Sequence, residues 1–78
     1  MTHDRIETNP VIMFGKPVIK GTRITVEHIL RKLAGEMTIS EILADHPHLT
    51  PDDVYAAAAF AADYLAQEEI VFAGGERL

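Results

Sequence analysis

The segment GKPVIKGTRIT, residues 15–25, holds the side chains of this sequence whose types best suit the binding of an anion. Lys16, Lys20 and Arg23 lie among β-branched residues and are accompanied by two glycines. Lysine offers a compact positive charge to a phosphate group, and arginine can donate two parallel hydrogen bonds to it. Contact with phosphate groups is therefore the chemistry that this segment favours.

The candidate phosphate-binding set also includes a hydroxyl in the same segment and two basic residues downstream. The full set is Lys16, Lys20, Thr22, Arg23, Arg31 and Lys32. The first 32 residues hold six basic and three acidic side chains, a charge of +3, whereas residues 33–78 hold one basic and nine acidic side chains, a charge of −8. An acidic chain binds nucleic acid only where its positive charge gathers on one face.

Two interpretations of this positive segment are open at the level of sequence. In the first, an extended ribbon contacts DNA, which a β-ribbon does more effectively when a dimer doubles it. In the second, Lys20 and Arg23 form ion pairs with acids of the third predicted helix or of a partner chain. For the uneven charge of the chain as a whole, a solvated surface that only aids solubility is a separate, simpler alternative.

The remaining motifs do not favour catalysis, a cofactor or a metal site. The segment resembles a phosphate loop only superficially, because Lys20 precedes Gly21 and Pro17 removes a backbone donor. The sequence has no cysteine, and it offers no nucleophile beside a base. His46 and His48 flank a proline, which is typical of an exposed turn rather than of a helical zinc-binding pair. We expect a protein without catalytic residues, cofactor or metal.

Two kinds of pattern divide the chain into a β part and a helical part. Residues 5–25 alternate short β-branched pieces with turn residues, which predicts a ribbon of short strands (RIET, VIMF and VIKGTRITV) and a turn at Gly21. From Val26 the apolar spacing becomes helical and predicts helices over residues 26–34, 38–46 and 50–66. Thr25, Thr38 and Thr50 are the predicted N-caps, and Gly35 is predicted to follow the C-cap of the first helix.

The third predicted helix has an apolar surface wider than one neighbour inside a small domain requires. Val54, Ala58, Ala61 and Leu65 share one face, which is widened by Ala57, Phe60 and Tyr64. Beyond this helix, residues 68–78 form a tail with the apolar run Ile70–Phe72. We expect a dimer or partner interface formed by Phe60, Tyr64, Ile70, Val71 and Phe72. Propensity alone also explains an alanine-rich helix.

Length and composition predict one small domain, residues 1–78, that associates with a partner. A core of this size contributes only about 3–5 kcal/mol, and no cysteine is present to add a disulfide. No run of residues approaches the ~20 apolar residues of a membrane span, and the N-terminus has no apolar signal core. We therefore expect a cytoplasmic protein with no membrane association that forms a homodimer or a higher oligomer.

The predicted architecture is mainly α-helical: a three-helix, helix-turn-helix-like (homeodomain-like) unit over residues 26–67 behind a short N-terminal β element. In such units the second helix of the pair normally reads DNA with basic or amide side chains from its first turns. The third helix instead begins with Asp52, Asp53 and Tyr55 and contains no basic residue. If the protein binds DNA, this helix is a poor candidate for the reader.

The phrases GKPVIKGTRI and EILADHPHLTPDD resemble the small bacterial and archaeal family known as domain of unknown function 433, over residues 5–66. The resemblance implies a three-helix domain with a short β element. It also implies an antitoxin of a type II toxin–antitoxin pair, of the VapB kind, which neutralises a PIN-like ribonuclease and binds its own promoter DNA.

These expectations lead to two functional hypotheses of different classes. In the first, a homodimeric antitoxin contacts operator DNA through residues 15–25 and the first helix, and contacts its toxin through the acidic half and the tail. In the second, the chain is a protein-interaction or dimerisation module without nucleic-acid binding. Retardation of a promoter fragment distinguishes the two.

Overall fold

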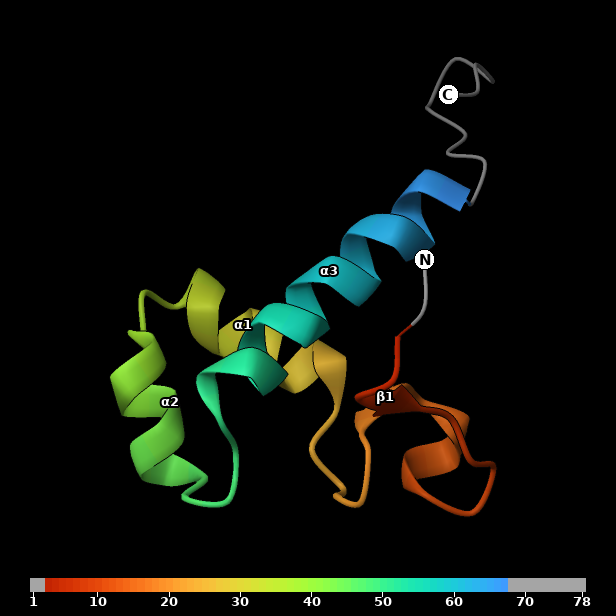
Figure 1. Ribbon diagram of the computed structural model, residues 1–78, viewed down its shortest axis with the longest axis horizontal. Coiled ribbons are helices and arrows are strands. Elements are labelled where there is room, and N and C mark those ends of the chain that lie inside the picture. The colour runs from red at the N-terminus through yellow and green to blue at the C-terminus, as the bar shows by residue number, and fades with distance from the viewer. Residues whose placement is uncertain (1–2, 68–78) are drawn as a thin grey trace.

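A computed structural model describes residues 3–67, which form three helices and a two-stranded antiparallel sheet (Figure 1). The elements in chain order are β1 (Ile6–Glu7), β2 (Val18–Ile19), α1 (Val26–Ala34), α2 (Ile39–Asp45) and α3 (Pro51–Gln67). α3 packs against α1, α2 and β1. The predicted mainly α-helical fold with a short N-terminal β element is therefore confirmed. The predicted interface residues Ile70, Val71 and Phe72 lie outside the described residues.

The N-terminal ribbon is shorter than the sequence pattern predicts. β1 and β2 pair Ile6 with Ile19 and Glu7 with Val18, and the predicted strand VIMF does not form. Its place is taken by a left-handed turn, in which Met13, Phe14 and Gly15 have φ values of 48°, 58° and 79°. Non-glycine residues rarely adopt this region, so alternation of β-branched residues gave the wrong prediction for this piece.

Each helix begins where its capping chemistry predicts. The Thr25 hydroxyl accepts a hydrogen bond from the His28 amide at the start of α1. Thr38 and Glu41 form a reciprocal capping box at the start of α2. These side chains satisfy backbone donors that a helix leaves without an internal partner. The predicted N-caps at Thr25 and Thr38 are therefore confirmed.

The end of α1 differs from its prediction by one residue. Gly35 is the C-cap itself, with φ of −83°, and the left-handed residue after it is Glu36, with φ of 67°. The amides of Glu36 and Met37 donate to the carbonyls of Leu33 and Lys32, which is the hydrogen-bond pattern of a Schellman motif. The prediction from glycine therefore located the end of α1 correctly, but the residue in the left-handed conformation is Glu36 and not Gly35.

The core lies where the three helices and β2 meet. It consists of Ile19, Val26, Ile29, Ile42, Leu49, Val54 and Ala57. The buried face of α3 is thus Val54 and Ala57, whereas Ala58 and Leu65, which the predicted face included, are exposed. None of the helices in residues 3–67 is both long enough and apolar enough to span a membrane.

Candidate functional site

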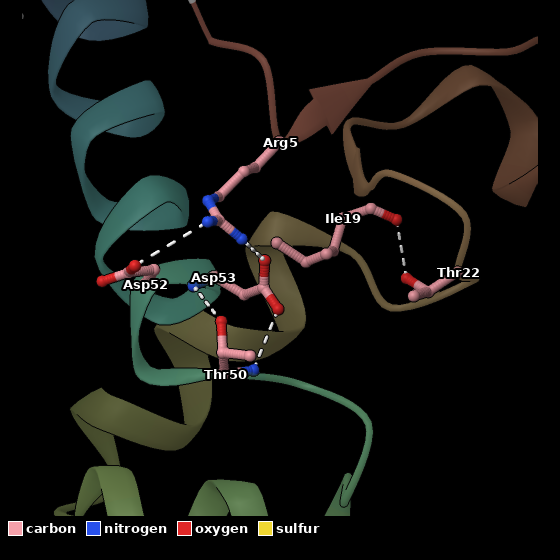
Figure 2. Close-up of polar contacts among 6 residues, drawn as sticks. All are labelled: Arg5, Ile19, Thr22, Thr50, Asp52 and Asp53. Carbon is pink, nitrogen blue, oxygen red and sulfur yellow. Dashed lines mark hydrogen bonds and ion pairs between the residues drawn. The ribbon is translucent and has the colours of Figure 1, made fainter.

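The turn of residues 20–23 joins β2 to α1 and presents two basic side chains. Gly21 has φ of 79°, as predicted for a turn residue, and its amide donates to the Glu7 carboxylate over 3.0 Å. The Thr22 hydroxyl donates to the Ile19 carbonyl over 2.7 Å and accepts from the Ile24 amide over 3.0 Å. These two hydrogen bonds of the Thr22 side chain stabilise the turn. Figure 2 shows the bond to the Ile19 carbonyl.

Lys20 and Arg23 in this turn are exposed, and neither forms an ion pair with an acid within residues 3–67. They are separated by only two residues in the turn that follows β2. The prediction that these two cations pair with acids of the third helix does not hold for this chain. Their positive charge is therefore available to a ligand.

The other cations of the predicted set are paired with acids within the chain. Lys16 Nζ and Arg31 Nε lie 3.1 and 3.0 Å from the two carboxylate oxygens of Glu27. Lys32 Nζ lies 2.7 Å from Asp45 Oδ2. These bonds to the basic side chains lower the pKa of Glu27 and of Asp45 below their ordinary values. The structure therefore separates the predicted phosphate-binding set into two available cations and three paired ones.

Arg5, which the sequence analysis did not select, makes the ion pair with the third helix (Figure 2). Its guanidinium lies 3.1 Å from Asp53 Oδ1 and 3.7 Å from Asp52 Oδ2. The second oxygen of Asp53 accepts from the Thr50 amide over 2.9 Å, and the Asp53 amide donates to the Thr50 hydroxyl over 3.3 Å. This confirms Thr50 as the N-cap of α3 and attaches the N-terminal segment to the same helix end.

The balance of forces on Asp53 favours its charged form. Burial of the side chain opposes ionisation most strongly, but the hydrogen bonds from the Thr50 amide and from Arg5 together lower its pKa below the ordinary value. A carboxylate that accepts backbone and guanidinium donors is stabilised in its charged state. Asp53 is therefore occupied inside the fold, and it is not available to a partner protein.

A broad apolar groove lies between α1, the end of α3 and the left-handed turn. It encloses about 710 Å³ and is lined mainly by aliphatic and aromatic side chains. The lining residues that matter below are Pro17, Leu30, Ala34, Phe60, Tyr64 and Leu65. Phe60 and Tyr64, both predicted interface residues, are stacked with ring centroids 6.1 Å apart. The groove therefore brings together the predicted interface residues that fall within the described part of the chain.

Two histidines meet beside α2, away from the groove. The rings of His28 and His46 pack edge to face with centroids 5.7 Å apart, and the buried Nε2 of His46 has no hydrogen-bond partner in the described part of the chain. No group of three or more residues within 3–67 has the geometry to hold a metal ion. The pair is thus a ring contact between α1 and the C-cap of α2.

We expect the stability of the protein to fall as the pH is lowered below about 6.5, because of His46. Burial and the nearby charges of Lys32, His28 and His48 lower its pKa from the ordinary value of 6.5, and Asp45 opposes this only in part. The unfolded chain then binds more protons than the folded chain, so stability is lost as pH falls from 6.5 toward the folded pKa. Thermal melting at pH 7.5 and 5.5 measures the effect. The pH-dependent loss should shrink in His46→Phe and persist in the control His48→Gln.

Comparisons with known proteins agree with this fold. A family model described as a protein of unknown function (DUF433) matches residues 6–61. The chain is similar to a crystal structure of a DUF433 member protein from Anabaena variabilis, with a TM-score of 0.76 and 28% identity over 82% of this chain. The chain spans 63% of the length of that protein. No curated protein matches the sequence.

Proposed function

The chain belongs to the DUF433 family of proteins of unknown function, and we propose that it is a non-catalytic antitoxin of a type II toxin–antitoxin pair. In this proposal it binds and neutralises a PIN-like ribonuclease and contacts its own promoter DNA. The DNA contact is made by the turn of residues 20–23. The resemblance of GKPVIKGTRI and EILADHPHLTPDD to this family motivates the antitoxin role.

The availability of Lys20 and Arg23 is the observation that supports DNA contact. Every other lysine and arginine within residues 3–67 lies within 4 Å of an acidic side chain. Thr22 and Gly21 hold the turn rigid, so the two charges are presented without a large entropic cost of ordering the backbone. This narrows the predicted contact surface to the turn and removes Lys16, Arg31 and Lys32 from it.

A dimer would bring two such turns to the duplex, with four cations in total. Counterion release then gives a slope of roughly −3.5 for the logarithm of the association constant against the logarithm of salt concentration. In the variant Lys20→Ala with Arg23→Ala, we expect this slope to approach zero and binding at low salt to weaken by at least about tenfold. Gel retardation of the promoter fragment over a salt series measures both quantities.

The matched control for this experiment is Lys16→Ala with Arg31→Ala. It removes the same number of positive charges, but from two side chains that share an ion pair with Glu27. We expect this variant to keep most of the salt dependence. An unchanged slope in the Lys20 and Arg23 variant, or an equal loss in the control, would contradict DNA contact through the turn.

The acidic half of the chain supports the toxin-binding part of the proposal. Residues 33–78 carry a charge of −8, which complements a basic surface of the kind that a ribonuclease presents to its substrate. Inhibition of a co-expressed PIN-like nuclease, encoded by the neighbouring reading frame, tests this role. A nuclease whose activity is unaffected by an excess of the protein would rule it out.

The second candidate function is a protein-interaction or dimerisation module that does not bind nucleic acid. The pairing of Lys16, Arg31 and Lys32 with acids favours it, because these cations would have to break ion pairs before they could reach a phosphate. Under this hypothesis the promoter fragment is not retarded even at low salt, while association between protein chains is unaffected.

A further inference from the structure

We propose that the apolar groove between α1 and α3 is filled by residues 70–72 of a second copy of this chain. In the resulting dimer each chain inserts its tail segment Ile70–Phe72 into the groove of the other. The exchange is reciprocal and obeys twofold symmetry, as closed homodimers usually do. This assigns the tail to the dimer instead of to the toxin contact expected from the sequence.

The groove has the chemistry of a site for an apolar chain segment. Leu30 and Ala34 of α1 face Phe60, Tyr64 and Leu65 of α3 across it. Leu65 is 57% exposed in the single chain, although leucine is among the residues most often buried. A volume of about 710 Å³ lies within the range of sites that enclose most of a bound ligand. An apolar occupant would remove this surface from water.

The sequence that follows α3 provides an occupant of matching chemistry. The structure describes α3 as far as Gln67, which follows the groove residues Tyr64 and Leu65 by less than one turn. The sequence continues through residues 68–78, and its apolar run Ile70–Phe72 begins three residues after Gln67. These are the only large apolar side chains of that segment apart from the terminal leucine. An isolated apolar run of this kind suits insertion between the helices of another chain.

The sequence after Gln67 favours a second copy over the chain's own tail as the occupant. For Ile70 to enter the groove of its own chain, the chain would have to turn back over Glu68 and Glu69, directly after the last residue of α3 that the structure describes. Tight reversals after a helix usually require glycine or asparagine in the left-handed region, or a proline. Neither glutamate supplies this, and the glycines at 74 and 75 come only after the apolar run. This sequence therefore favours a neighbouring chain as the acceptor of the apolar run.

Sedimentation equilibrium of the full chain tests the proposal. We expect the natural sequence to form dimers, and Phe72→Asp and Leu65→Asp each to weaken dimerisation by about 100-fold or more, since each places a carboxylate in an apolar contact. The control is Tyr55→Asp, which changes a 60% exposed aromatic residue of α3 outside the groove. This variant should remain dimeric. Circular dichroism melting shows whether each variant is folded.

Mixing the two variants distinguishes exchange between chains from a tail that binds its own groove. The Phe72→Asp chain keeps an intact groove, and the Leu65→Asp chain keeps an intact tail. Exchange between chains predicts that the mixture forms heterodimers more tightly than either variant forms homodimers, because one contact is restored. A monomeric natural protein, a dimer that survives Phe72→Asp, or a mixture without heterodimers would overturn the proposal.

This inference stands apart from the DNA-binding proposal and can fail separately. The groove variants change neither Lys20 nor Arg23, and Lys20→Ala with Arg23→Ala changes no groove residue. The control for the turn variant changes Lys16 and Arg31, which line the groove, so sedimentation is measured for it as well. Loss of dimerisation is read from sedimentation, whereas loss of DNA contact is read from the salt slope of gel retardation. If the protein dimerises through the groove but does not retard DNA, the proposed dimer stands and the proposed DNA contact is wrong.

Discussion

Ile29→Ala is expected to lower the free energy of unfolding by about 2–5 kcal/mol, which is the range for truncating a large aliphatic side chain in a packed core. Ile29 is fully buried in α1, and it packs in the core cluster with Ile42 and Val54. A domain of this size has a total stability of only about 3–5 kcal/mol. The variant should therefore be substantially unfolded at 25 °C.

Urea titration at a fixed protein concentration measures this loss, because the stability of a dimer depends on concentration. Ile29→Val removes one methylene group and should cost only about 0.5–1.5 kcal/mol. Val11→Ala, at an exposed position outside the core, should be close to neutral. A stable Ile29→Ala protein would show that the core is not centred on α1.

Asp53→Ala is expected to lower the free energy of unfolding by about 2–3 kcal/mol, although Asp53 lies in the first turn of a helix. Its side chain is only 11% exposed and accepts hydrogen bonds from both Arg5 and the Thr50 amide. The variant keeps Thr50 as the N-cap, but loss of a buried hydrogen bond to a charged group costs about 1.5–3 kcal/mol. The Arg5 guanidinium is half exposed, so water replaces part of its lost partner.

Asp52→Ala is the matched control for this second prediction. The two acids are adjacent and of the same type, but the Asp52 side chain is 75% exposed and lies 3.7 Å from Arg5. Exposed ion pairs contribute little to stability, so we expect a change below about 0.5 kcal/mol. Chemical denaturation of both variants compares them directly. Equal losses of stability in the two variants would mean that the hydrogen bonds of Asp53 to Arg5 and Thr50 add nothing beyond the effect of one negative charge at this helix end.

Features that depend on neighbouring residues were predictable from the sequence. The N-caps at Thr25, Thr38 and Thr50 and the turn at Gly21 follow from the chemistry of a few adjacent residues, and the structure contains all of them. The helix boundaries followed from these caps and from the apolar spacing. Local rules succeeded because they describe how nearby side chains satisfy backbone groups.

Features that depend on distant residues were not predictable in the same way. The partner of Asp53 is Arg5, which is 48 residues away in the sequence, and no local pattern connects them. The pairing of Lys16 with Glu27 depends on how the left-handed turn is placed against α1. The sequence alone therefore could not distinguish basic residues that form ion pairs from those that do not. The clustering of basic residues in the sequence therefore led to a prediction with too many unpaired cations.

The left-handed turn at Met13 and Phe14 places two non-glycine residues in a conformation that costs folding free energy. Each bulky residue held at positive φ costs about 1–2 kcal/mol, a large share of what so small a domain has. Glycine adopts that conformation without the steric cost, but it adds entropy to the unfolded chain. Phe14 is 94% exposed and contributes almost nothing to the core, so the strain at this residue is a cost to folding that no core contact of its side chain offsets.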